Sequence, residues 1–168
     1  QHVPAAAERA GHGEICYQIM RKYLSPMNST FYWVNIPLLS WKHKRGRLLE
    51  LLNALKYCEA AGVSLIHMSI GTDYYGDFAP IEEALSRLFH QGVIVVAAAN
   101  NSNIVAYPAC SPYTIGVVSN PTLLDSEYAV LSDYERNLKQ LDFAASSKHL
   151  IRLRGAAKMI SHSNSFAA

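Results

Sequence analysis

The stretch GVIVVAAA, residues 92–99, decides the fold class of this 168-residue chain. It is a continuous apolar run that begins at Gly92 and is followed by Asn100 and Asn101. A strand that is buried on both faces of a parallel sheet has this composition, because helices cover both sides of such a sheet. The run is also far shorter than the roughly 20 apolar residues that span a bilayer. It therefore predicts a central strand of an α/β domain.

Helical and strand patterns alternate on both sides of this run. Apolar residues recur at spacings of three and four, or follow a first-turn proline, in three predicted helices: 13–24, 47–61 and 81–90. Short β-branched, aromatic or apolar segments predict four further strands: 30–36, 63–69, 113–119 and 141–144. Such alternation predicts right-handed crossovers, and so an α/β fold in which helices flank a mainly parallel sheet in three layers.

The composition favours one globular domain and excludes several classes of protein. Half of the residues are apolar and 17% are charged, which rules out a disordered tail, a collagen-like fibre and a coiled coil. Fifteen basic and thirteen acidic side chains give a net charge of +2 without a basic run. We therefore expect no nucleic acid and no membrane surface among the partners.

The three cysteines, Cys16, Cys58 and Cys110, lie in unrelated apolar contexts. An odd number without metal-type spacing predicts buried thiols rather than disulfides or metal ligands. We expect no metal site and no cofactor. Reduced thiols slightly favour a cytoplasmic location.

Two polar clusters directly follow predicted strands, where α/β sheets carry their chemistry. In the first, HMSIG at residues 67–71 half-matches the G-x-S-x-G turn of α/β-hydrolases. Because His67 replaces the first glycine and a loop replaces the helix that should follow, Ser69 is a weak candidate nucleophile. In the second cluster, Asn101 could satisfy a turn or donate its amide to an oxyanion.

His12 and Ser165 are two further candidates, each with an ordinary explanation. His12 lies between two glycines at the opening of a helix, where a histidine is more often structural or merely exposed. Ser165 precedes a run of small apolar residues, so it could be a helix N-cap or a nucleophile at a helix N-terminus. Taken alone, neither residue establishes a catalytic site.

The order of these segments resembles that of the subtilases, the subtilisin-like serine peptidases of the S8 type. AGHGEIC at 10–16 resembles the motif around the catalytic histidine of that family, and GVIVVAAANN at 92–101 resembles its oxyanion-hole strand. SNSFAA at 163–168 resembles the G-T-S-M-A motif of the nucleophile. Three more segments match in the same order: VSLIHMSIG at 63–71, AYPACSPYTIGVVS at 106–119 and LDFAA at 141–145.

The resemblance implies a subtilisin-like fold and a role for each matched residue. His12 would be the general base, Ser165 the nucleophile and Asn101 the side-chain donor of the oxyanion hole. An extended substrate would pair with Ser69, Ile70 and Gly71, and the pocket floor would comprise Ala97, Ala98, Ala99 and Asn100. The resemblance also implies a cis peptide bond at Tyr107-Pro108.

The chain departs from the family pattern around the nucleophile. Ser163-Asn164 replace Gly-Thr, and Asn100 replaces the glycine before the oxyanion asparagine. These changes place side chains where backbone should approach the substrate. The insertion that builds a calcium site in several members is absent from residues 13–24.

The triad aspartate of the family lies on a strand upstream of the histidine. Residues 1–11 contain no aspartate, and Glu8 is too close to His12 in sequence to replace a carboxylate from another strand. We therefore expect residues 1–168 to be a partial peptidase domain. Its Asp-bearing segment would lie upstream and its C-terminal helix region downstream, so this span alone should be a poor peptidase.

The sequence thus predicts a serine endopeptidase that acts on peptide or protein substrates. A propeptide or other segments of the same polypeptide are further expected partners. One alternative is a peptide-binding pseudoprotease of the same fold. Another is an α/β-hydrolase that uses Ser69. The resemblance is also compatible with secretion.

Overall fold

The computed structural model describes residues 11–24, 30–34, 36, 44–102, 104–153, 156–161 and 163–168. The helices are α1 (His12–Leu24), α2 (Lys44–Ala60), the short 3-10 helix η3 (Tyr75–Asp77), α3 (Phe78–His90), α4 (Asp133–Lys139) and α5 (Asn164–Ala167). The strands are β1 (Leu65–Met68), β2 (Ile94–Ala98), β3 (Ile115–Ser119), β4 (Tyr128–Val130), β5 (Phe143–Ala145), β6 (His149–Leu153) and β7 (Ala156–Ile160).

The main sheet has the strand order β1-β2-β3-β5-β4. Its first four strands are parallel, and β4 is antiparallel to β5 at one edge. Strand β1 forms the other edge in the part of the chain that the structure describes. The parallel arrangement brings the carboxyl ends of β1, β2 and β3 to one side of the sheet, where polar loops follow them.

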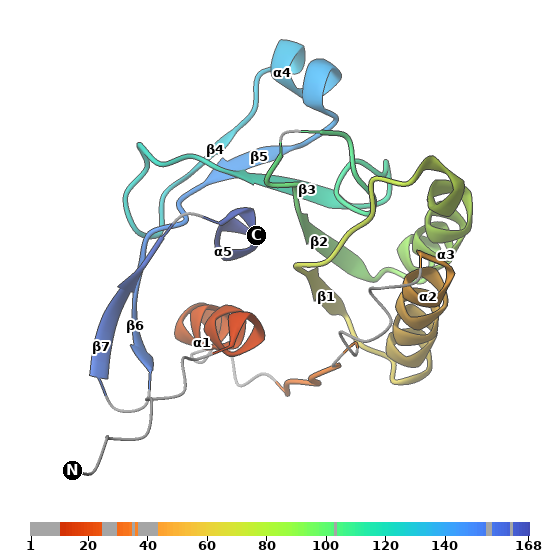
Figure 1. The fold of residues 1–168 in the computed structure, drawn as a ribbon, viewed down its shortest axis with the longest axis horizontal. Helices are drawn as coiled ribbons and strands as arrows, with labels where there is room; N and C mark the ends of the chain where they lie inside the picture. Colours follow the sequence, from red (N-terminus) through yellow and green to blue (C-terminus); the bar gives the residue numbers. More distant parts are fainter. Residues whose placement is uncertain are drawn as a thin grey trace, which may run out of the picture.

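Helices cover both faces of this sheet, as Figure 1 shows. On one face, α2 and α3 bury an apolar core in which Ile81, Leu85 and Leu88 are at most 1% exposed. The opposite face carries α1 and α5, whose small cluster contains Cys16 and Phe166. Three layers result, as the sequence predicts.

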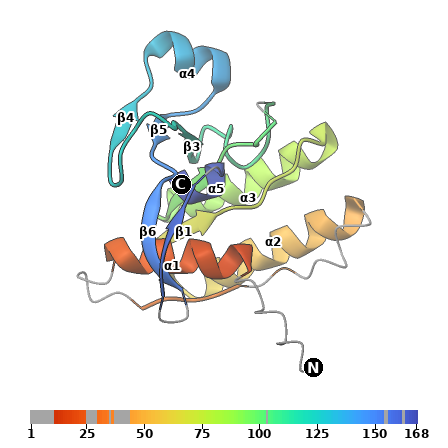
Figure 2. The same cartoon turned by 60° about the vertical axis from the view of Figure 1, so that its left-hand side comes forward.

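Strands β6 and β7 form a separate antiparallel hairpin. Figure 2 shows it crossing α1, with which β6 is in contact. Ile151 of β6 joins the same small cluster as Cys16 and Phe166. The hairpin thus links α1 to α5 on the second face of the molecule.

The predicted strand at 30–36 is wrong within the described residues, because 30–34 and 36 belong to no helix or strand. Aromatic and β-branched residues favour strands only where they pack against a neighbouring strand, and here residues 30–34 remain exposed. Phe31 and Trp33 contact the Tyr17 ring edge-on, with ring centroids 5.9 Å apart in both pairs. The other predicted elements are confirmed to within a few residues at each end.

Candidate active site

Helix α1 begins at His12, whose exposed ring stacks on Phe166 of α5 with ring centroids 5.4 Å apart. A Cβ atom on Gly13 would lie 2.7 Å from the Trp33 ring. Gly13 therefore leaves room for the Trp33 ring beside the start of the helix that carries His12.

Cys16, one helical turn after His12, is the point where three of the predicted motifs meet. Its buried Sγ lies 3.7 Å from His12 Nε2 and 3.6 Å from the Ser69 hydroxyl. The thiol also donates to the Ser165 carbonyl oxygen at 3.7 Å. Burial raises the pKa of Cys16, so near neutral pH the group remains an uncharged thiol.

Ser165 lies inside α5 and is 8% exposed, while the N-cap of that helix is Ser163. The Ser163 hydroxyl accepts a hydrogen bond of 3.2 Å from the Ser165 backbone N–H. Among the described residues, no hydrogen bond joins the Ser165 hydroxyl to His12. The two groups lie on contacting helices, but the structure does not show them paired.

Asn101 lies beside the same helix, because its Oδ1 accepts a 3.0 Å hydrogen bond from the Asn164 backbone N–H. This contact occupies the oxygen of the amide and leaves its NH₂ group as a donor. The buried Asn164 side chain donates to the carbonyls of Ala99 and Asn100, and accepts from Ser119 N–H. Asn164 therefore fastens the start of α5 to the ends of β2 and β3.

The Ser69-Ile70-Gly71 segment directly follows β1. It leads into a backbone bridge in which Thr72 and Tyr107 exchange hydrogen bonds of 2.8 and 2.9 Å. A Cβ atom on Gly71 would lie 2.8 Å from the Tyr107 carbonyl oxygen, so a side chain does not fit here. The Tyr107-Pro108 peptide bond is cis, which confirms that expectation.

The four residues expected at the pocket floor differ in exposure. Ala97 is 0% exposed and packs in the main core, so its side chain offers no surface to a ligand. Ala98, Ala99 and Asn100 are half-buried. The Asn100 side chain accepts a 2.7 Å hydrogen bond from Ser102 N–H.

A second histidine, His67 of β1, is electrostatically coupled to His12. Burial, with a smaller contribution from the His12 charge, lowers the pKa of His67 to about 4. At neutral pH His67 is therefore uncharged. A neutral neighbour does not oppose a positive charge that forms on His12.

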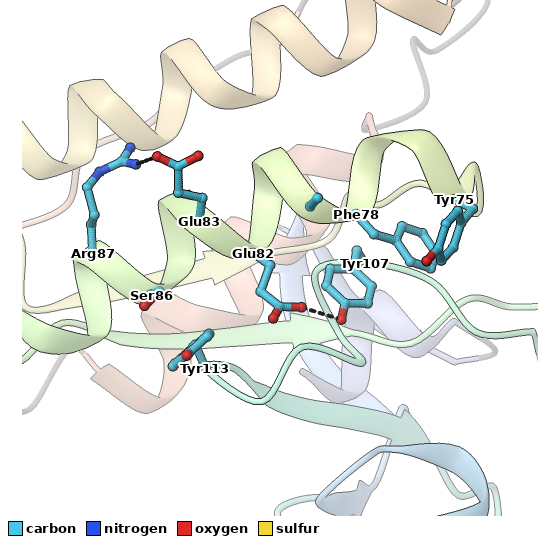
Figure 3. Close-up of a pocket in the computed structure, with 9 residues that line it drawn as sticks. Tyr75, Phe78, Glu82, Glu83, Ser86, Arg87, Tyr107 and Tyr113 are labelled. Atoms are coloured by element: carbon cyan, nitrogen blue, oxygen red, sulfur yellow. Dashed lines mark hydrogen bonds and ion pairs between the residues drawn. The ribbon is translucent and has the colours of Figure 1, made fainter.

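A groove of about 550 Å³ lies between α3 and the segment that carries Tyr107 and Tyr113, and Figure 3 shows its lining. The Tyr107 hydroxyl donates to Glu82 at 2.6 Å, and Phe78 stacks on the Tyr107 ring at 4.3 Å. Burial and the Glu82 carboxylate raise the pKa of Tyr107 to about 12. This lining includes neither a histidine nor a cysteine, and it contains none of the candidate site residues that the sequence predicts.

Within the described part of the chain, no group of three or more His, Cys, Asp and Glu residues could hold a metal ion. No described helix is both long and apolar enough to cross a membrane. Cys16 and Cys110 are buried free thiols, and Cys58 is a half-buried one.

Comparison with known proteins places this fold among the subtilisin-like protease domains. The self-cleaved protease domain of PatA matches with a TM-score of 0.54 and 26% identity, over 75% of this chain and 49% of that one. The prenylagaramide maturation protease PagA matches with a TM-score of 0.52 and 18% identity, over 83% and 48%. The PatG macrocyclase in complex with peptide matches with a TM-score of 0.50 and 18% identity, over 72% and 37%.

The chain thus spans about half the length of the first two of these solved protease domains. No protein-family model matches it, and no curated protein does.

The structure also contains site features that the sequence did not reveal. Asn164 stands out in the sequence only as a departure from the family motif, yet its side chain makes three hydrogen bonds. Asp125 and His149 gave no signal, because they lie in unrelated segments. Only the fold brings them together beside α5, at 3.1 Å.

Proposed function

We propose that the chain is part of a subtilisin-like serine endopeptidase of the S8 type, with Ser165 as its nucleophile. The observation that carries the proposal is the meeting of three motifs at Cys16. In a fold shared with protease domains, this thiol contacts His12, Ser69 and the Ser165 carbonyl. The proposed domain is partial. Its length supports this, because the match covers only 49% of the PatA protease domain.

In the proposed reaction, His12 accepts the Ser165 hydroxyl proton while the Ser165 oxygen attacks a peptide carbonyl. The tetrahedral intermediate then collapses, the bond to the amine breaks, and His12 returns the proton to the leaving nitrogen. A water molecule then attacks the resulting ester while His12 accepts a proton from the water. The ester bond breaks, and His12 returns the proton to the Ser165 oxygen, which frees Ser165. No described carboxylate hydrogen-bonds the His12 ring, so the group that orients it would lie upstream.

The negative oxygen of the intermediate would be stabilised by the Asn101 side-chain NH₂ and the Ser165 backbone N–H. The Asn101 amide is already oriented, because its Oδ1 accepts from Asn164 N–H. The Ser165 N–H, however, donates to the Ser163 hydroxyl. Ser163 must turn away before this second donor can face the substrate.

Substrate would lie along Ser69, Ile70 and Gly71 as an added strand, since main-chain pairing fixes the register of a peptide without a particular sequence. The surface beside the scissile bond would come from Ala98, Ala99 and Asn100, with Ala97 behind it. A peptide occupies the PatG macrocyclase in its solved complex, which supports a peptide as ligand of this fold. A propeptide of the same polypeptide would pair with the same three residues, 69–71.

A second candidate function is peptide binding without turnover. Two observations favour it: the Ser165 N–H donates to the Ser163 hydroxyl, and among the described residues no hydrogen bond joins the His12 ring to the Ser165 hydroxyl. In that case the strip at 69–71 would bind peptides while Ser165 stayed unreactive.

Hydrolysis of a mixture of short peptides, followed by mass spectrometry, separates these two functions. The test compares residues 1–168 with the same span extended at both ends by its native flanking sequence. We expect Ser165-dependent hydrolysis from the extended protein and far less from the shorter one, since in subtilisin loss of the triad Asp alone costs about 3 × 10⁴ in kcat. Equal activity from both proteins would contradict an upstream carboxylate.

The matched control is Ser165→Ala in each protein. Hydrolysis that survives this substitution would contradict the proposed nucleophile. If the extended protein binds peptides but does not hydrolyse them, the binding function is correct.

A further inference from the structure

His149, the first residue of β6, is a buried histidine directly behind the predicted nucleophile. It is 5% exposed, and its Nε2 lies 2.6 Å from the carbonyl oxygen of Phe166, the residue after Ser165. Its other ring nitrogen, Nδ1, lies 3.1 Å from the Asp125 carboxylate and 3.0 Å from the Tyr23 hydroxyl. Both ring nitrogens are therefore engaged.

These contacts select one protonation state of the ring. A backbone carbonyl only accepts hydrogen bonds, so Nε2 must carry a proton. A carboxylate also only accepts, so the contact with Asp125 is attractive when Nδ1 carries a proton as well. The Tyr23 hydroxyl has a single proton, which it donates to Asp125. The charged imidazolium is thus the form that satisfies every contact.

The counter-ion of this imidazolium is fixed by α1. Lys22 and Tyr23, in the last turn of α1, both hydrogen-bond the Asp125 carboxylate. Burial alone would raise the pKa of Asp125, but the hydrogen bonds from Lys22, Tyr23 and His149 and the Lys22 charge lower it to about 2. Asp125 is therefore negative over the whole range in which a histidine titrates.

We propose that His149 is a positioning residue for Ser165, and that its charged pair with Asp125 holds the nucleophile turn against α1. The chain of contacts runs from α1 through Asp125 and His149 to the Phe166 carbonyl. Because His12 begins α1 and Ser165 precedes Phe166, this chain sets the two predicted catalytic groups relative to each other. The inference rests on the proposed function, because it assigns His149 a role in that reaction.

The positioning role has a pH signature. His12 must be uncharged to accept the Ser165 proton, whereas the proposed hold on the turn requires the charged form of His149. The reaction therefore needs the two groups in opposite protonation states. The ionisable groups that face the His149 ring are Asp125 from the segment before β4 and Tyr23 from α1, with Lys22 behind Asp125. From α5 the ring meets only the Phe166 carbonyl, and its register partner on β7 is Ile160.

The first test uses the 168-residue chain. It measures the protonation state of His149 and the protection of the α5 amides from hydrogen exchange. Nitrogen-15 spectra of the histidine side chains at pH 7 should show His149 with both nitrogens protonated in the wild type, and a neutral ring in Asp125→Asn. Hydrogen exchange at the α5 amides should be about tenfold faster in His149→Gln, since a hydrogen bond from a charged donor is lost. A neutral wild-type ring, or unchanged exchange, would overturn the proposal.

The second test follows labelling of Ser165 by a fluorophosphonate probe from pH 5 to pH 10 in the protein extended at both ends by its native flanking sequence. The wild-type rate should rise and then fall. The falling limb should move to lower pH in Asp125→Asn and disappear in His149→Gln, which a merely structural contact would not do. The exposed residues Asp133 and His90 supply matched controls, and Asp133→Asn and His90→Gln should leave the profile unchanged.

A labelled Ser165 with the same pH profile in His149→Gln as in the wild type would overturn the positioning role while the proposed function stands. If no protein labels at Ser165, the proposed function fails. The ring charge and the α5 exchange rates then decide by themselves whether His149 holds the turn.

Discussion

The two faces of the sheet are built from different chemistry. The face under α2 and α3 is a large apolar core in which Ile81 and Leu85 are completely buried. The face under α1 and α5 has a much smaller apolar cluster. Instead it buries Asn164, Ser165 and His149, and hydrogen bonds hold the side chains of Asn164 and His149.

This difference separates stability from chemistry within one domain. Apolar burial is non-directional, so the first face stabilises the fold without setting the position of any one atom. Buried polar groups need partners in defined positions, so the second face fixes where its side chains lie. Substitutions on the two faces should therefore affect different measurements.

The largest effect that we expect is on reactivity, from His12→Ala. A general base contributes about 10²–10⁴-fold to such a reaction, so labelling of Ser165 by a fluorophosphonate should slow by at least that lower factor. Because His12 is exposed, the free energy of unfolding should change little. His90→Ala, on an exposed α3 residue, is the control, and a labelling rate that is equal in both variants would refute the base.

Leu85→Ala should have the opposite pattern. Truncating a leucine that is 0% exposed costs about 2–5 kcal/mol, because it removes apolar contacts and leaves a cavity. Urea unfolding followed by circular dichroism measures the loss, and Leu138→Ala, at a residue 65% exposed, is the control. In the molecules that stay folded, Ser165 should label at the wild-type rate, and a slower rate would show that the two faces are coupled.

His67 should make stability depend on pH on the β1 side of the site. Its pKa is about 4 in the folded chain and near 6.5 when unfolded, so the unfolded state binds more protons between these values. Stability should therefore fall as pH drops from 6.5 to 4, by at most about 3 kcal/mol. His67→Gln should flatten the pH dependence of the free energy of unfolding between pH 6.5 and 4. An unchanged slope would mean that another group causes this dependence.

Ser163→Ala should have the smallest effect, and it should raise reactivity. Removing the hydroxyl frees the Ser165 N–H for the developing oxyanion, which should speed labelling about threefold to tenfold. The same change removes the N-cap of α5 and should cost about 1 kcal/mol of stability. Slower labelling would mean that the cap matters more than the released donor.

The sequence predicted the apolar face better than the polar one, for a physical reason. Burial of helix and strand faces leaves a periodic pattern, so the three predicted helices and β1, β2, β3 and β5 could be located from local residues. The hairpin β6–β7 lacks that signal, since Leu150 and Met159 are exposed apolar residues in it. The Asp125–His149 pair depends on contacts between distant segments, which no local pattern encodes.

The candidate site shows the same limit. The order of motifs singled out His12, Asn101 and Ser165, and the fold brings them to contacting segments. The hydrogen bond between Ser163 and Ser165 and the three bonds of Asn164 depend on side-chain geometry that the motif order does not contain. The sequence therefore identified the candidate residues, and the structure supplied the hydrogen bonds that restrict their side chains and backbone.

The most direct test of the account is the site of covalent labelling. The chain, with its native flanking sequence, is treated with a fluorophosphonate probe, digested, and mapped by mass spectrometry. We expect a single label on Ser165 that is lost in Ser165→Ala and retained in Ser69→Ala. A label on Ser69, or none in a folded protein, would contradict it.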